Sequence, residues 1–256
     1  MSATSTTPIV KGTGAHHVIA LNGWFGRAED WGVFTDHLDM ENFTWHFFEY
    51  RGYGARKNED TGQYDLAEIS REVTEYIGGL GVAKLSLLGH SMGTVFMQRI
   101  LLDSPVEITA LVGISAVPAS GTPLDEQSRA LFESAATQEA SRRTIIDFTS
   151  GSHLPDSWLD QMAADSMAHS TPEAVRNYLL AWADADFAAE LGTQDLPVLI
   201  LTGANDPAAT SDFATDTYGQ IYPNLTVEEL PDTGHYPMFE HPLSLTTKVV
   251  TFLRSV

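Results

Sequence analysis

Hydrophobic positions along the chain come in short runs that end in polar or glycine-rich turns. The run from Leu85 to Leu88 ends in the pentapeptide Gly-His-Ser-Met-Gly at 89–93. Apolar residues at helical spacing follow this turn at once, namely Val95, Phe96, Ile100 and Leu101. A continuous apolar run before the turn and a helical period after it predict a buried strand, a sharp turn and a helix.

Further apolar runs predict strands at 16–21, 44–50, 108–117, 196–201 and 225–230. Amphipathic patterns predict helices between some of them. One helix is expected to begin after the capping residue Asp65 and to end at the glycine pair 78–79, and another to close the chain from about residue 241. This alternation predicts an α/β fold with a mostly parallel twisted sheet flanked by helices.

The alternation stops between residues 120 and 196. This stretch has no convincing strand, but a capping residue or proline precedes an apolar pattern at 122–125, 155–157 and 171–173, which indicates helix starts. We therefore expect residues 1–119 to form the first part of a core, residues 120–196 an inserted group of helices, and residues 197–256 the second part of the core.

Composition narrows the class of protein. A chain of 256 residues is long enough for one domain with a sizeable core and an inserted subdomain. Its formal charge of −20 repels phosphate backbones and anionic lipid surfaces, so we expect neither nucleic acid nor a membrane as a partner. The absence of cysteine excludes disulfides, thiolate catalysis and zinc–thiolate sites.

The first 14 residues are polar and lack the basic start and apolar centre of a secretion signal. No stretch approaches the roughly 20 consecutive apolar residues that span a bilayer. We expect a soluble, cytoplasmic protein, and the sequence does not predict its oligomeric state.

Ser91 is the candidate nucleophile. A serine on a tight strand-to-helix turn is held in a strained conformation at the positive end of the following helix, where an oxyanion is stabilised. Gly89 and Gly93 leave room where a β-carbon would strike the neighbouring strand or helix. In this context the pentapeptide resembles the nucleophile elbow of the α/β-hydrolase family.

The resemblance implies a triad in the order serine, acid, histidine. Ser91, Asp206 and His235 occur in this order, each in a turn directly after a predicted strand. The competing bases are His90, whose side chain is expected to point elsewhere, His153 and His169 in the insertion, and His241 at a helix start. The competing acid, Asp232, is expected to shape the turn before His235.

Two backbone N–H groups are the inferred oxyanion donors. The strand at 16–21 runs into Asn22-Gly23-Trp24-Phe25-Gly26, where the family carries a His-Gly dipeptide and Asn22 replaces the histidine. The resemblance implies that the N–H of Trp24 is one donor and the N–H of Met92 the other.

The four basic residues of the insertion, Arg129, Arg142, Arg143 and Arg176, are expected on the surface.

The insertion resembles the lid of the family, and most of its apolar side chains are expected to pack its helices against each other. Some must line an apolar pocket between the insertion and the sheet. The side chains expected around this pocket are Asn22, Phe25, Trp158, Met162, Tyr178, Trp182 and Tyr236.

These features predict a serine hydrolase that needs no cofactor or metal and cleaves small to medium, largely apolar carboxylic esters or lactones through an acyl-enzyme on Ser91. Carbon–carbon bond hydrolysis, perhydrolysis and cyanohydrin lysis use the same triad and stay open. A receptor or pseudoenzyme that only binds a ligand is the alternative from another class, and it has no need of all three triad residues.

Overall fold

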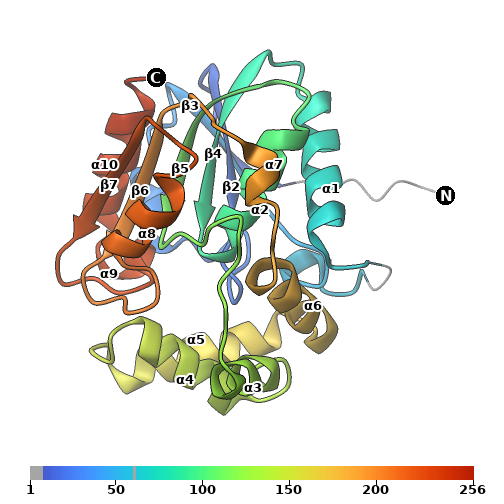
Figure 1. Cartoon of the computed structure of the whole chain (residues 1–256), viewed down its shortest axis with the longest axis vertical. Coiled ribbons are helices and arrows are strands. Elements are labelled where there is room, and N and C mark those ends of the chain that lie inside the picture. Colours follow the sequence, from blue (N-terminus) through green and yellow to red (C-terminus); the bar gives the residue numbers. More distant parts are fainter. Residues whose placement is uncertain (1–7, 60–61) are drawn as a thin grey trace.

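A computed structural model describes residues 8–59 and 62–256 of the chain. Residues 1–7, which belong to the polar N-terminal stretch, lie outside the described residues. The core is a seven-stranded sheet with the order β1-β3-β2-β4-β5-β6-β7. Helices α1 and α2 lie on one side of this sheet and α10 on the other (Figure 1). The predicted α/β fold is therefore confirmed.

Each of the six predicted strands is present. They are β2 (His16–Leu21), β3 (Phe43–Phe48), β4 (Lys84–His90), β5 (Glu107–Ile114), β6 (Val198–Gly203) and β7 (Leu225–Leu230). These six pair in parallel, whereas β1 (Ile9–Gly12), which the sequence pattern did not predict, pairs antiparallel with β3 at the edge. Strands β3 and β6 are buried along their whole length, which explains why β3 is rich in aromatic residues and β6 begins with four aliphatic ones.

The helices of the core follow the predicted signals in part. Asp65 caps α1 (Leu66–Gly79) by accepting the N–H of Glu68, and α10 (Pro242–Leu253) closes the chain. The sequence analysis did not predict the 3₁₀ helices η1 (Gly32–His37) and η2 (Gly54–Arg56), nor the helices α7 (Ala188–Leu191), α8 (Ser211–Tyr218) and α9 (Pro237–Glu240). Helix α2 (Met92–Asp103) begins immediately after β4, as expected for a strand–turn–helix unit.

Four helices occupy most of the chain between β5 and β6. They are α3 (Glu126–Ser134), α4 (Glu139–Thr149), α5 (Asp156–Ala168) and α6 (Pro172–Ala183). Asp125 and Thr171 cap α3 and α6 with their side-chain oxygens, in agreement with two of the predicted starts. These four helices gather at one end of the sheet (Figure 1). We call them the inserted helices.

Arg142 corrects one expectation, because it is buried among the inserted helices and only 1% exposed. Its guanidinium donates to the carbonyl of Ala135 at 2.7 Å and to the hydroxyls of Ser166 and Ser170 at 3.1 and 2.9 Å. It also lies 5.4 Å from the centre of the Phe25 ring. Neutral acceptors and an aromatic face therefore solvate this cation in place of water.

Within the described part of the chain, none of the helices combines the length and the apolar character needed to cross a bilayer.

Candidate active site

Ser91 lies at the turn between β4 and α2 in a conformation that side chains rarely adopt, with φ 51° and ψ −120°. The two glycines of the motif make this turn possible. A β-carbon on Gly89 would lie 2.8 Å from the backbone of Gly93, and one on Gly93 would lie 2.3 Å from the carbonyl oxygen of Leu21. The turn is therefore pressed against strand β2, and it holds Ser91 at the end of the sheet.

His235 and Asp206 form a close pair at the same end of the sheet. His235 follows β7, Asp206 follows β6, and Nδ1 of His235 lies 2.6 Å from Oδ2 of Asp206. The other oxygen of Asp206 accepts the backbone N–H groups of Ala208 and Ala209 at 2.9 and 3.2 Å. Together these contacts fix the orientation of both side chains.

The charge of the pair follows from these contacts. Burial alone would raise the pKa of Asp206, but the interaction with His235 and the backbone hydrogen bonds hold this pKa below its usual value. Asp206 is therefore ionised and accepts the Nδ1–H of His235. In a neutral ring, this tautomer leaves Nε2 of His235 able to accept a proton, as a base requires.

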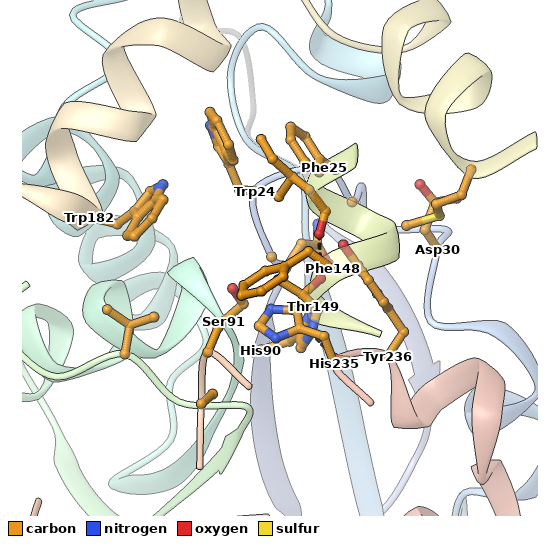
Figure 2. Close-up of a pocket in the computed structure, with 18 of the residues that line it drawn as sticks. Trp24, Phe25, Asp30, His90, Ser91, Phe148, Thr149, Trp182, His235 and Tyr236 are labelled. Atoms are coloured by element: carbon orange, nitrogen blue, oxygen red, sulfur yellow. Dashed lines mark hydrogen bonds between the residues drawn. The ribbon is translucent and has the colours of Figure 1, made fainter. Parts of the chain in front are cut away.

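Ser91 and His235 line the same cavity, together with His90. Figure 2 shows these three side chains close together at the floor of the pocket. Among the described residues, no hydrogen bond joins the Ser91 hydroxyl to the His235 ring. Such contacts are often long in the unliganded protein and shorten when substrate binds.

The other histidines take different positions. His90, which was expected to point elsewhere, lines the cavity beside Ser91. It is held there because its ring lies against those of His235 and Tyr236, with ring centres 5.2 and 5.6 Å apart. His153, His169 and His241 are not among the residues that line the cavity. Asp232, the competing acid, is exposed and has a φ of 52°, in keeping with a role in the turn.

Asn22 replaces the histidine of the family's dipeptide and holds the loop from both sides. Its Nδ2 donates to the carbonyl of Phe48 at 3.1 Å, and its Oδ1 accepts the indole N–H of Trp31 at 2.6 Å. A β-carbon on the next residue, Gly23, would lie 2.6 Å from Nδ1 of His90. Glycine is therefore required where the loop passes the histidine ring.

Trp24 follows in a turn closed by the N–H of Gly26 and the carbonyl of Gly23 at 3.1 Å. Its indole donates to the carbonyl of Val175 in α6 at 2.8 Å. Met92 is the first residue of α2, where an N–H has no acceptor within the helix. Met92 directly follows Ser91, and a β-carbon on Gly23, the residue before Trp24, would lie 3.4 Å from Cβ of Ser91. The side chain of Met92 is fully buried and is not among the residues that line the cavity.

The cavity has a volume of about 190 Å³. It lies between the inserted helices and the sheet and is mostly apolar, with an ion pair between Arg27 and Asp30 at 3.0 Å in its wall. Of the residues expected from the sequence, those that line it are Asn22, Phe25, Met162, Trp182 and Tyr236. Lining residues that the sequence analysis missed include Phe132, Ile145, Phe148, Thr149, Met238 and Phe239.

Tyr178 and Trp158 do not line the cavity, so their assignment to it is corrected. Tyr178 is fully buried in the core, where its hydroxyl donates to the carbonyl of Arg51 at 3.1 Å. Trp158 lies behind the cavity wall and contacts Tyr236 and Phe239, with ring centres 5.7 and 5.8 Å away. Both are apolar residues of the inserted helices that serve packing.

Trp182 has the only buried side-chain nitrogen or oxygen without a hydrogen-bond partner among the described residues. Its ring lies 5.9 Å from those of Trp24 and Phe132, centre to centre. Aromatic faces are weak acceptors and replace a hydrogen bond only in part.

Among the residues that the structure describes, no group of three or more His, Cys, Asp or Glu side chains is arranged to hold a metal ion.

Comparisons with known proteins agree with this architecture. The non-heme chloroperoxidase of Streptomyces lividans is 23% identical over 259 residues, which cover 93% of this chain and 91% of that protein. A dihydrolipoyllysine-residue acetyltransferase component of the acetoin cleaving system, from Pseudomonas putida, is 26% identical over 196 residues. That alignment covers 74% of this chain and 51% of the relative, so the chain spans about half of its length.

Among solved structures, the esterase EaEST from Exiguobacterium antarcticum superposes with a TM-score of 0.83 at 19% identity, covering 96% of this chain and 94% of the esterase. At this level of identity the likeness establishes the fold alone. A family model described as the alpha/beta hydrolase family matches residues 18–247. The strand–turn–helix unit at Ser91, the sheet order and this match agree, and the chain belongs to the α/β-hydrolase family.

Proposed function

We propose that the protein is a serine hydrolase that cleaves small to medium, largely apolar carboxylic esters or lactones through an acyl-enzyme on Ser91. The observation that carries the proposal is the 2.6 Å contact between His235 and an ionised Asp206 at the wall of the cavity that Ser91 also lines. A base in this tautomer beside a strained serine is the arrangement that acyl transfer requires.

In the first step, the Ser91 oxygen attacks the ester carbonyl while Nε2 of His235 takes the hydroxyl proton. Asp206 stabilises the imidazolium that forms and remains ionised itself. The negative charge on the former carbonyl oxygen is stabilised by the N–H groups of Trp24 and Met92, each of which contributes about 3 kcal/mol in sites of this kind.

The imidazolium then returns its proton to the leaving alcohol, and the acyl group stays on Ser91. In the second step, Nε2 of His235 removes a proton from water, and the hydroxide oxygen attacks the acyl carbonyl. The acid product leaves when Ser91 regains the proton. For a lactone, the alcohol and the acid belong to one product molecule.

The cavity supports an apolar substrate of modest size. Aromatic and aliphatic side chains from α3, α4, α5 and α6 face Ser91 and His235 across about 190 Å³. We assign the lid role to residues 120–196, and the core to residues 1–119 and 197–256. In this assignment the inserted helices exclude water and select the substrate, whereas the core supplies the reacting groups.

The test is the reaction of Ser91 with a fluorophosphonate probe and with nitrophenyl esters of graded acyl length. Ser91→Ala is expected to abolish labelling and to lower ester hydrolysis by more than about 10³-fold. Ser128→Ala is the matched control, because Ser128 is a cavity hydroxyl outside the proposed triad. Labelling and hydrolysis that survive in the Ser91→Ala variant would refute the proposal, and an unlabelled wild-type protein would favour a ligand receptor.

Perhydrolysis is a second candidate, favoured by the chloroperoxidase name of the Streptomyces lividans relative. Here hydrogen peroxide replaces water in the second step, so that a peroxy acid leaves and Ser91 regains its proton. Peroxy acid formation from a short acyl ester and peroxide, measured against acid formation in the same mixture, separates the two activities.

A further inference from the structure

The loop that carries His235 is held on both flanks by one carboxylate. Glu240, the last residue of the short helix α9, accepts the backbone N–H of Gly234 on Oε2 at 2.7 Å. It accepts the backbone N–H of Tyr236 on Oε1 at 2.9 Å. Its side chain is only 3% exposed. The residues immediately before and after His235 are therefore bound to the same rigid group.

The carbonyl of His235 is fixed as well. It accepts Nε2–H of His90 at 2.8 Å and the hydroxyl of Ser115 at 3.3 Å. The backbone N–H groups on either side of His235 and its own carbonyl thus each have a named partner. The ring itself is free to exchange protons at Nε2, because Asp206 occupies only Nδ1.

The outer side of Glu240 meets the inserted helices. Nε2 of His153, in the connection between α4 and α5, lies 3.2 Å from Oε2 of Glu240. The same connection touches the His235 loop directly, since a β-carbon on Gly234 would lie 2.6 Å from Cα of Ser150. Neighbouring backbone therefore shields the Glu240 carboxylate from water.

We propose that Glu240 is a positioning residue for His235: its carboxylate, by holding the N–H groups of Gly234 and Tyr236, keeps Nε2 of His235 where it can take the proton of Ser91. This inference rests on the proposed function, because it concerns the base of that reaction. Glu240 is not among the residues that line the cavity, so its effect is carried by the backbone of the loop.

The chemistry of the contact explains why a carboxylate is needed. Two N–H groups face the two oxygens, and hydrogen bonds to an ionised acceptor are shorter and about twice as strong as neutral ones. Glu240→Gln keeps the size of the side chain but turns an NH₂ group toward one of the two N–H donors. One flank of His235 is then released. A displacement of about 1 Å at a catalytic group can lower the rate by about 10²-fold.

A purely structural role makes a different prediction. If Glu240 only stabilised α9, its substitution would lower the free energy of unfolding and leave the turnover of the folded enzyme unchanged. If it positions the base, the larger loss falls on kcat, and KM for the same ester changes less, because most of the side chains that line the cavity come from the inserted helices and the loop after β2.

The experiment compares the full-length wild type with Glu240→Gln, Glu240→Asp and His153→Gln. Glu240→Gln is expected to lower kcat for a nitrophenyl ester and the rate of fluorophosphonate labelling by about 10- to 100-fold, with KM changed by less than about threefold. Glu240→Asp keeps the charge but is one methylene too short to reach both N–H groups, so its kcat should lie between those of wild type and Glu240→Gln. It also serves as the second variant if Glu240→Gln does not fold.

His153→Gln is the matched control, because it removes the imidazole that contacts Glu240 and leaves both N–H contacts in place. Its kcat is expected to stay within about threefold of wild type. Folded Glu240 variants with wild-type kcat and labelling rate would overturn the inference, as would a loss of activity confined to KM. A wild-type protein that neither hydrolyses esters nor reacts with the probe would instead refute the proposed function.

Discussion

His90 donates its Nε2–H to the backbone carbonyl of His235 across 2.8 Å. A carbonyl can only accept, so this contact fixes the tautomer of His90 and leaves its Nδ1 unprotonated. Burial, with a smaller contribution from the neighbouring His235, lowers the pKa of His90 to about 3. His90, which precedes the proposed nucleophile, is therefore uncharged, and its hydrogen bond supports the backbone of His235, the proposed base.

Replacing this support with a ring that cannot donate should slow the reaction. His90→Phe keeps an aromatic ring between His235 and Tyr236 but removes a hydrogen bond worth about 1 kcal/mol. We expect kcat for a nitrophenyl ester to fall about 10-fold with a smaller change in KM. Steady-state kinetics on the folded variant check this, and a wild-type kcat would contradict it.

Asp206→Asn tests the acid of the proposed triad. The amide has the size of the carboxylate but cannot stabilise the imidazolium, and it can impose the wrong tautomer on His235. We expect kcat to fall by about 10³- to 10⁴-fold with the fold retained. Asp232→Asn is the same substitution three residues before His235, at an exposed turn with φ 52°, and it should leave kcat unchanged. Equal effects of the two substitutions would argue against Asp206 as the acid.

Gly23→Ala tests the close approach of the loop to His90. The new β-carbon would lie 2.6 Å from Nδ1 and 2.9 Å from Cε1 of the histidine ring, which itself is wedged against His235. We expect activity to fall by about 10²-fold as the loop moves away with its N–H donor. Gly26→Ala has nothing closer than 3.7 Å to its β-carbon and should keep most of its activity. The ratio of kcat/KM between the two variants measures the effect.

Glu49 should make the stability of the fold depend on pH. Burial raises the pKa of Glu49 to about 7, against hydrogen bonds that lower it, so the folded protein holds this proton more tightly than the unfolded chain. Its contribution to stability is therefore complete below about pH 4.5 and is lost as the pH rises through about 7.

Glu49→Gln removes this dependence. We expect the variant to lose less free energy of unfolding than wild type between pH 5 and 8, by roughly 1 kcal/mol or more. Denaturant titrations at both pH values give the comparison, and Glu75→Gln, at an exposed position, is the control. A variant with the same pH dependence as wild type would show that Glu49 is ionised throughout.

The sequence was sufficient for the six parallel strands and for the turns that follow them. Strands such as β6, buried on both faces, consist mostly of apolar residues, and the residues after them fall at one end of a parallel sheet. The sequence pattern did not predict strand β1, because this strand has only four residues and Val10 within it is 48% exposed. Short, half-exposed strands carry too little pattern to be recognised.

The pocket was predicted less well, for a physical reason visible on α6. Tyr178 and Trp182 lie one turn apart on the same helix and have the same apolar character, yet Tyr178 is buried in the core and Trp182 lines the cavity. The periodicity of a helix indicates which face is buried, but it does not indicate whether that face packs against the core or lines the cavity. The contacts of Glu240 with backbone N–H groups leave no periodic signal either, and so only the structure revealed them.

The hydrogen bond from the Trp24 indole to the carbonyl of Val175 joins the loop at the end of β2 to a helix that is 151 positions away in sequence. The inserted helices therefore cannot be exchanged without affecting the loop after β2. A chimera that carries the inserted helices of another protein would lose this hydrogen bond together with the original cavity walls. Changes in substrate range and changes in turnover should arise together in evolved variants of this chain.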